Sequence, residues 1–381
     1  MKVCVGSPGR FTTFNLAREL ERHGHLHTVY TGFPPWKVDG VPRERVRSWP
    51  WLISTRMLAS KWGFRWFERS WNRLATENFD NWMSHRLEPC DVFHCLSGFG
   101  IGTHQIAKER YSALTICDRG SAHILYQDEI LAEEYARWGI EYNPIDRRLV
   151  ERELQEYDLC DLIFVPSSFA YRSFVEKGVP EAKLVKIPYG VDLSLFRPLP
   201  KEDDVFRVIY VGAMSLRKGI PYLLDATAGR DVPKLEVWLI GGLDPEVKPF
   251  LARYEGRYRY FGIIPRSNLY KYYSQASVFV IASIEEGFGL VQAQAMACGL
   301  PVIATTNSGA ENLFTDGVEG FIVPIRDPEA IRDRVLYLRK HRDVRDEMGR
   351  AALQRVRKLR GWESYGEQVL AAYRQVISVG R

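Results

Sequence analysis

The chain has 381 residues and a formal net charge of +5, and 46% of its residues are hydrophobic and 26% charged. This length suits two domains, each large enough for a core of its own, and the composition excludes a disordered chain. No apolar run reaches the ~20 residues that a membrane span needs, and the strand-like opening MKVCVGSPG argues against a signal peptide. We therefore expect a cytoplasmic protein, at most peripherally attached to the inner face of the cytoplasmic membrane.

The first half of the chain alternates between strand-like and helix-like runs. KVCVG predicts a strand, SPGR a turn and FTTFNLARELERHGH a helix, because Phe14, Ala17 and Leu20 recur at helical spacing. The further strand-like runs are LHTVY, CDVFHCL, ALTICD, LIFVP and KLVKIPYG. This alternation indicates a parallel sheet covered by helices on both faces, in a first domain of residues 1–196.

The segment 36–73 interleaves basic and tryptophan side chains. Such a mixture suits an anionic interface, either lipid or nucleic acid, and the alternative is a Trp-rich helical face packed in the core. The residues are Trp36, Arg43, Arg45, Arg47, Trp49, Trp51, Arg56, Lys61, Trp62, Arg65, Trp66, Arg69, Trp71 and Arg73. Because basic residues cluster in this one segment and no nucleic-acid-binding motif accompanies them, we do not expect a nucleic-acid partner.

The cysteines indicate a reducing compartment. They lie in apolar runs, with neither a CxxC motif nor a His pair at metal-ligand spacing. We therefore expect buried thiols rather than disulfides. They are Cys4, Cys90, Cys95, Cys117, Cys160 and Cys298.

After the Pro-rich and acidic stretch RPLPKEDDVFRV, which reads as a linker, the alternation restarts. The strand-like runs are VIYVGAM, LEVWLIGG, YRYFG, SVFVIAS, PVIATT and GFIVP. We expect a second doubly wound domain over residues 197–362, followed by a helix over 363–381 that packs back on the first domain. Two such domains imply a cleft at the carboxyl ends of their strands, where ligands of these sheets bind.

The stretch IEEGFGLVQAQAMACGLPVIAT, residues 284–305, predicts a loop, a helix from about Leu290 and a further strand. The backbone amides of Phe288, Gly289 and Leu290 would then lie at a helix N-terminus, which suits phosphate oxygens. Since a carboxylate there would repel phosphates, Glu286 is better placed to bind sugar hydroxyls, and Gln294 to bind a second hydroxyl-bearing group such as a ribose. The alternative is that these residues only cap and solvate the helix.

From about residue 118 to 325 the chain resembles the family-four retaining glycosyltransferases, which have the GT-B fold. The resemblance rests on IPYGVDLSLFRP, VGAMSLRKG, YFGIIPRSNLYKYYSQASVFVIAS and EGFGLVQAQAMACGLPVI, in that order. It implies an α/β architecture of two Rossmann-like doubly wound domains that face each other across a cleft.

The resemblance also implies a donor site in the second domain. In that family a first Glu, here Glu286, contacts the donor sugar, and a second Glu, replaced here by Gln294, contacts the ribose. An Arg and a Lys bind the donor diphosphate: Lys218 matches the Lys, Ala213 stands where the Arg is usual, and Arg217 could compensate. The remaining expected donor-binding residues are Gly287, Phe288, Gly289 and Leu290 in the loop, and Gly262, Ile263 and Ile264 near the base.

On the first-domain side, the family has a His or Asp that touches the transferred sugar. His123 is the preferred match and Asp118 the second, in TICDRGSAHILYQ just past a strand, where Arg119 also lies. Gly9 and Arg10 belong to the first strand–helix loop, which faces acceptor and phosphates in the family.

Two further groups of residues are expected to be structural. Acidic residues in helical runs are read as solvated faces, and LSGFGIG as a tight turn. The acidic residues are Glu133, Glu134, Glu151 and Glu153.

We expect transfer of a sugar from a nucleotide-diphosphate sugar to a hydroxyl of a glycan, lipid-linked or small-molecule acceptor, with retention of configuration. No metal or other cofactor is expected, because the DxD-like triplet at 202–204 lies in the linker. The alternatives are a weakly active or inactive sugar-nucleotide-binding subunit and a GT-B-fold sugar-nucleotide epimerase. Segment 36–73 is expected to contact anionic membrane or to hold a lipid-linked acceptor.

Overall fold

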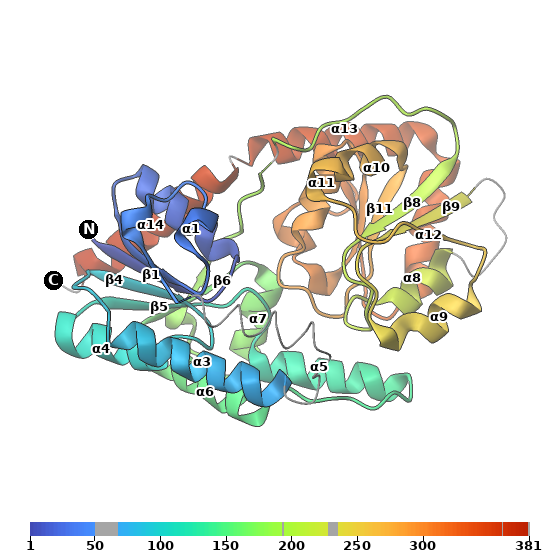
Figure 1. The fold of residues 1–381 in the computed structure, drawn as a ribbon. Coiled ribbons are helices and arrows are strands. Elements are labelled where there is room, and N and C mark those ends of the chain that lie inside the picture. The colour runs from blue at the N-terminus through green and yellow to red at the C-terminus, as the bar shows by residue number, and fades with distance from the viewer. Residues whose placement is uncertain (50–67, 193, 228–234, 360, 380–381) are drawn as a thin grey trace.

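The structure is a computed structural model that describes residues 1–49, 68–192, 194–227, 235–359 and 361–379. Two α/β units lie side by side, each built on a twisted parallel sheet (Figure 1). Residues 50–67 of segment 36–73 lie outside the described residues, and the expected membrane contact of this segment stays a prediction. None of the described helices is both long and apolar enough to cross a membrane.

The first domain contains a seven-stranded sheet in the order β3-β2-β1-β4-β5-β6-β7. Its central strands are almost completely buried, as expected for a parallel sheet with helices on both faces. The strands are β1 (Val3–Ser7), β2 (Leu26–Thr31), β3 (Val46–Ser48), β4 (Val92–Leu96), β5 (Leu114–Asp118), β6 (Leu162–Val165) and β7 (Leu184–Lys186). The helices are α1 (Thr12–Arg22), α3 (Glu68–Ser84), α4 (Ile101–Tyr111), α5 (Ile124–Arg137), α6 (Arg147–Leu159) and α7 (Ser168–Glu176), with short 3₁₀ turns η1 (Pro35–Lys37), η2 (Arg43–Arg45) and η4 (Glu181–Lys183).

The second domain contains a six-stranded sheet in the order β10-β9-β8-β11-β12-β13. The strands are β8 (Phe206–Val211), β9 (Leu235–Ile240), β10 (Arg259–Tyr260), β11 (Val278–Ile281), β12 (Val302–Thr305) and β13 (Gly320–Val323). The helices are α8 (Ile220–Thr227), α9 (Lys248–Arg253), α10 (Leu269–Gln275), α11 (Leu290–Ala297), α12 (Pro328–Lys340) and α13 (Arg342–Lys358), with 3₁₀ turns η5 (Pro245–Val247), η6 (Arg266–Asn268), η7 (Thr306–Ser308) and η8 (Ala310–Asn312).

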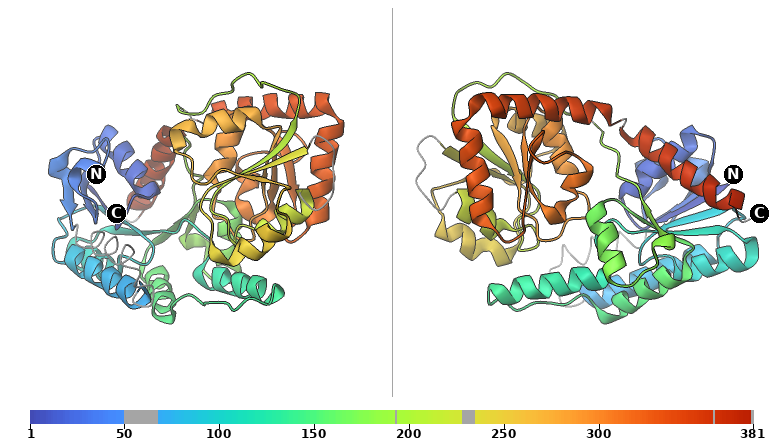
Figure 2. Two further views of the ribbon diagram at one scale, coloured as in Figure 1. Left: turned by 45° about the vertical axis from the view of Figure 1, so that its right-hand side comes forward. Right: turned by 180° about the vertical axis from the view of Figure 1, so that it is seen from behind.

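The last helix, α14 (Gly361–Val379), returns to the first domain and packs against α1 (Figure 2). The Tyr373 hydroxyl lies 2.8 Å from Nδ1 of the buried His94 on β4. The chain therefore passes between the domains twice, once after β7 and once before α14. These two passages touch, because a Cβ on Gly190 would lie 2.5 Å from the carbonyl oxygen of Gly361.

Helix α5 of the first domain reaches across to the second domain, as Figure 1 shows. At its C-terminal end the Trp138 ring packs edge-on against Phe250, with centroids 4.9 Å apart. Arg326 Nε lies 2.7 Å from a carboxylate oxygen of Glu134, which is fully buried. The expectation that Glu134 belongs to a solvated face is therefore wrong, because the second domain covers it.

All six cysteines are buried and unpaired, as the sequence predicted. Burial raises the pKa of several of these thiols, including Cys95 and Cys117, above the ordinary value. Such thiols are poor nucleophiles, since the thiolate is the reactive form. We infer that they are packing residues.

Candidate functional site

A cavity of about 320 Å³ lies between the domains, at the carboxyl ends of the second sheet's central strands. Both domains contribute to its wall, which is the position at which ligands of doubly wound sheets bind. The lining residues are Gly120, Tyr189, Tyr210, Val211, Gly212, Ala213, Lys218, Ile281, Glu286, Phe288, Gly289, Leu290 and Val291.

The loop between β11 and α11 forms one wall of this cavity. Gly289 caps α11 in the left-handed conformation, with φ of 65°, which glycine adopts without strain. The helix begins at Leu290, as the sequence predicted, and it ends at Ala297. Because Gly289 and Leu290 line the cavity, the N-terminus of α11 opens into it and suits an anion.

Lys218 and Glu286 form an ion pair in the cavity. Both side chains are largely shielded, with 16% and 21% of their surfaces exposed. Burial alone would raise the pKa of Glu286, but Lys218, Arg217 and the Gly289 amide outweigh it and hold that pKa below its ordinary value. At neutral pH the cavity therefore holds a charged carboxylate beside an ammonium group, able to bind hydroxyls and phosphate oxygens respectively.

Arg217, the neighbour of Lys218, is directed elsewhere. Its Nε and one terminal nitrogen each lie 2.7 Å from the same carboxylate oxygen of Glu285. Arg217 is not among the residues that line the cavity, whereas Ala213 is. The sequence-based idea that Arg217 compensates for Ala213 at the diphosphate therefore stays a prediction.

Comparison with known proteins identifies the family. A family model described as glycosyl transferases group 1 matches residues 193–355, and one described as Glycosyltransferase Family 4 matches residues 11–195. The chain belongs to the family-four type of glycosyltransferases.

Individual relatives agree with this assignment. A D-inositol 3-phosphate glycosyltransferase of Kribbella flavida is 32% identical over 52% of this chain and 52% of its own, so the chain spans about half the length of that relative. An uncharacterized glycosyltransferase of Methanocaldococcus jannaschii is 27% identical over 84% of this chain and 83% of its own.

Two solved structures share the fold. Sucrose-phosphate synthase from Thermosynechococcus elongatus has a TM-score of 0.74 at 22% identity, covering 100% of both chains. The Anabaena protein HepE, in complex with UDP and glucose, has a TM-score of 0.69 at 15% identity, covering 98% of this chain and 99% of its own. The expected GT-B fold is thereby confirmed.

Asp118 lies at the end of β5 in this family-four protein, close to the cavity but not in its wall. The carboxylate is buried, and its Oδ2 lies 3.4 Å from Nε2 of the buried His94. Burial first, and then the Asp118 charge, raise the pKa of the Tyr189 hydroxyl. Tyr189 lines the cavity, whereas contact of Asp118 with the transferred sugar stays a prediction.

His123 is a cap and core residue in the structure. Its Nδ1 accepts a hydrogen bond of 3.2 Å from the Leu125 backbone amide at the start of α5, and its ring packs against Tyr157 and Phe174. Burial, with Arg119 and Lys177 nearby, lowers the pKa of His123 to about 4, so it is neutral at pH 7. Contact with the transferred sugar stays a prediction for His123.

Arg119 is held inside the first domain. Its terminal nitrogens reach a carboxylate oxygen of Glu153 at 2.8 Å and the side-chain oxygen of Gln127 at 2.7 Å. Arg10 forms an exposed ion pair with Asp39 on the first loop, beside Gly9. Neither Arg119 nor this loop lines the cavity.

Gln294 and the loop 262–264 were also predicted to bind the donor, and neither lines the cavity. Gln294 is buried on α11, and its side-chain oxygen lies 3.5 Å from the Tyr273 hydroxyl. The loop of Gly262, Ile263 and Ile264 follows β10, with 80% of Ile263 exposed. The Gly262 carbonyl accepts a hydrogen bond of 2.8 Å from the Gly241 amide, which ties this loop to the end of β9.

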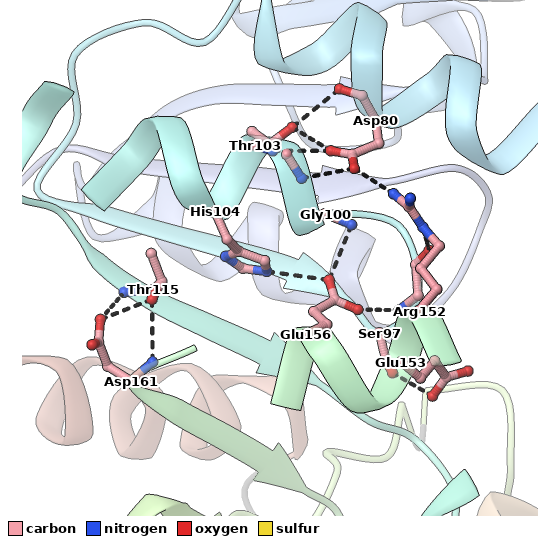
Figure 3. A network of polar contacts seen from close by, with 12 residues as sticks. Asp80, Ser97, Gly100, Thr103, His104, Thr115, Arg152, Glu153, Glu156 and Asp161 are labelled. Carbon is pink, nitrogen blue, oxygen red and sulfur yellow. Dashed lines mark hydrogen bonds and ion pairs between the residues drawn. The ribbon is translucent and has the colours of Figure 1, made fainter. Parts of the chain in front are cut away.

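A buried polar network anchors the turn between β4 and α4 (Figure 3). Glu156 on α6 accepts hydrogen bonds from the backbone amides of Gly98 and Gly100, and its Oε1 lies 3.3 Å from Nε2 of His104. Glu153 accepts a hydrogen bond of 2.7 Å from the Ser97 hydroxyl. LSGFGIG is thus a tight turn, as expected, but the solvated position expected for Glu153 is wrong, since this residue is buried.

The same network contains a group with metal-ligand chemistry. The ligand atoms of Cys95, His104 and Glu156 lie within 4.8 Å of one another. Both Glu156 oxygens already accept backbone hydrogen bonds, which gives this carboxylate a structural role. The group belongs to the first-domain core and is separate from the cavity.

The polar side chains in and beside the cavity that the sequence did not single out are those of Tyr189, Tyr210 and Glu285. Tyr189 and Tyr210 lie in the strand-like runs KIPYG and VIYVG, where an aromatic residue reads as core. Glu285 precedes Glu286, and the sequence could not tell which of two adjacent carboxylates faces which domain. The only available signal was their number: two acidic residues, 285 and 286, match two basic residues, 217 and 218.

Proposed function

We propose that the protein transfers a glycosyl group from a nucleotide-diphosphate sugar to a hydroxyl of an acceptor. The observation that carries the proposal is the Lys218–Glu286 pair beside the N-terminus of α11, in a cavity between the domains. The family membership and the names of the relatives support it.

In this proposal the donor diphosphate lies against the start of α11 and Lys218. The helix N-terminus and the ammonium group stabilise the negative charge that grows on the leaving diphosphate. Once Lys218 binds phosphate, Glu286 is released to accept hydrogen bonds from sugar hydroxyls. Gln294 is proposed for the ribose, and the loop 262–264 for the base.

Nucleoside diphosphates provide the first test, because a ligand that binds only the folded state raises its thermal stability. At ~100 times the Kd the gain is about 2.7 kcal/mol, which corresponds to a rise in Tm of about 5–10 °C for a domain of this size. We expect one of UDP, GDP, ADP, CDP and TDP to produce this rise, and Lys218→Ala to reduce it. If no diphosphate in the series raises Tm, the donor-site assignment fails.

We further propose that transfer retains the anomeric configuration and needs no metal. Glu286 is the one carboxylate among the described residues that line the cavity, and it is paired with Lys218. No second carboxylate in that wall is available as a nucleophile. Attack on the face that the diphosphate leaves, with the departing phosphate accepting the acceptor's proton, would account for this arrangement.

Retention and metal independence are tested together. The measurement follows the slow hydrolysis of a sugar nucleotide whose diphosphate is the one that raises Tm. Proton NMR, recorded before mutarotation, should show that the released sugar has the donor's own anomeric configuration. The rate of hydrolysis should be the same with and without EDTA. Release of the opposite anomer would contradict retention. A rate that EDTA abolishes and manganese restores would contradict metal independence.

A binding subunit without catalysis is the second candidate, and the uncharged Ala213 in the cavity wall favours it. Diphosphate binding without hydrolysis or transfer of the matching sugar nucleotide would support this candidate. The acceptor proposal covers a glycan, a lipid-linked or a small molecule, with segment 36–73 as the region of membrane or lipid contact. Co-sedimentation with anionic vesicles at low salt tests that contact.

A further inference from the structure

The carboxylate of Glu285 lies at the boundary between the domains and is fully buried. Its Oε1 accepts a hydrogen bond of 3.0 Å from the Ala122 backbone amide of the first domain. Its Oε2 accepts bonds from Gln127 Nε2 at 3.2 Å and from Arg217 Nε at 2.7 Å. Donors from both domains therefore satisfy this one charged group.

The contacts of Glu285 continue into the core of the first domain. Gln127 binds Arg119 through its side-chain oxygen, at 2.7 Å, and Arg119 binds Glu153 at 2.8 Å. Glu153 in turn accepts hydrogen bonds from Ser97 and Tyr157. The first-domain side of the contact is thus held by a buried network, which limits how far Gln127 can follow Glu285 when the domains separate.

Backbone contact between the domains is closest at the neighbouring residue. A Cβ on Gly287 would lie 1.9 Å from the carbonyl oxygen of Gly120 and 3.0 Å from Cα of Ser121. Only glycine permits this approach. The loop that carries Glu286 therefore rests directly on the first domain.

We infer that Glu285 is a positioning residue that holds the two domains in the closed arrangement, with Arg217 as its partner in the second domain. Opening the cleft would remove the Ala122 and Gln127 donors and leave the carboxylate with Arg217 alone. Water would replace these two donors in the open cleft, and because hydrogen bonds from protein groups to a charged group are net favourable, this carboxylate favours closure. Closure brings Gly287 against Gly120 and so places Glu286 and Gly120 in the wall of the same cavity.

This inference separates the roles of two adjacent cations: Lys218 faces the cavity, and Arg217 orients the closing carboxylate. Its catalytic consequence rests on the proposed function, because closure matters for transfer only if the cavity binds a donor. Its structural part does not, because the contacts of Glu285 are all with groups of the protein.

The test measures the distance between the domains by electron–electron double resonance in the full chain. Spin labels are placed on Arg110→Cys of α4 and Lys271→Cys of α10, both at exposed positions. The native cysteines are buried and should not be labelled. We expect a single narrow distance in the otherwise unchanged protein.

Glu285→Gln preserves the side-chain shape but replaces one acceptor oxygen by an NH₂ group that would face a donor. We expect the mean distance to lengthen by more than ~2 Å, the scale of domain rearrangements, and to broaden. Arg217→Gln, which removes the second-domain partner that orients the Glu285 carboxylate, should do the same. If both variants keep the narrow distance, the inference is overturned.

Glu133→Gln is the matched control. Glu133 also forms an ion pair across the domains, with Arg326, but 66% of its side chain is exposed. Surface pairs contribute little to stability, so its loss should leave the distance unchanged. A comparable lengthening in this control would show that any interdomain charge matters, and would overturn the specific role of Glu285.

Kinetics distinguishes positioning from binding. Glu285→Gln should lower kcat by about tenfold, the effect of one hydrogen bond to a charged group, while the Kd of the diphosphate identified above stays unchanged. A weaker Kd with unchanged kcat would contradict the positioning role. If no diphosphate binds and yet the variants lengthen the distance, the proposed function fails and the closing role stands.

Discussion

Lys218→Ala is expected to lower kcat for glycosyl transfer by about 10²–10³-fold, the effect of removing one preorganised group that stabilises developing charge. Lys218 is the one cationic side chain among the described residues that line the cavity, and Ala213 adds no charge there. Arg217 is paired with the buried Glu285. Without Lys218, the α11 N-terminus alone would face the leaving diphosphate.

The same variant should change the pH dependence of the reaction. In the native protein the pKa of Glu286 lies below its ordinary value because cations and the Gly289 amide outweigh burial. In Lys218→Ala burial is opposed only by Arg217 and that amide, so the pKa rises. The acidic limb of the kcat profile should therefore move to higher pH.

Two further variants complete this test. Lys218→Arg keeps the charge and should recover part of the rate. Lys248→Ala, at an exposed position on α9, should leave the rate unchanged. A decrease of only a few fold in Lys218→Ala would mean that another group neutralises the diphosphate, and the assignment of Lys218 would be wrong.

Gly287→Ala should lower kcat by about 10²-fold, because a displacement of ~1 Å at reacting groups can have an effect of this size. The added methyl carbon would meet the Gly120 carbonyl oxygen at 1.9 Å, and this is backbone that cannot rotate away. Gly287 is not among the glycines with positive φ. Alanine is therefore compatible with the loop itself, and the conflict arises only when the domains close.

A specific combination of results is expected for Gly287→Ala. The thermal stability of the protein and the Kd of the diphosphate should change little, while kcat falls and the distance between labels at positions 110 and 271 lengthens. Full activity at the native distance would show that the domains need not approach as closely as in this structure. Loss of diphosphate binding would show that the loop itself is damaged.

Local sequence pattern and family resemblance were sufficient to predict the architecture and the loop between β11 and α11. Alternating runs predicted both sheets, and the glycines around residue 288 predicted where α11 begins. Lys218, Glu286, Phe288, Gly289 and Leu290 do meet at one cavity. The elements and the proximity of these residues were predictable because each depends on short-range periodicity or on a motif of fixed spacing, whereas donor binding by these residues stays a prediction.

Contacts between distant segments were not predictable in the same way. Glu134 and Glu153 read as solvated because their helices are charged, and only tertiary packing on Arg326 and Arg119 buries them. His123 followed a strand at a plausible position, but the capping bond to Leu125 turns its ring into the core. A sequence pattern carries no information about which distant cation meets a given carboxylate.

The two passages of the chain between the domains have a mechanical consequence. They lie against each other at Gly190 and Gly361, so together they act as a single pivot on one side of the molecule. Sliding one domain past the other would strain both passages at once, whereas rotation about their contact strains neither. Tyr189, the neighbour of Gly190, lines the cavity, and its ring lies 5.7 Å from that of Phe288. The cavity therefore lies beside the pivot, and a small rotation there displaces the outer parts of the domains more than it displaces the cavity wall.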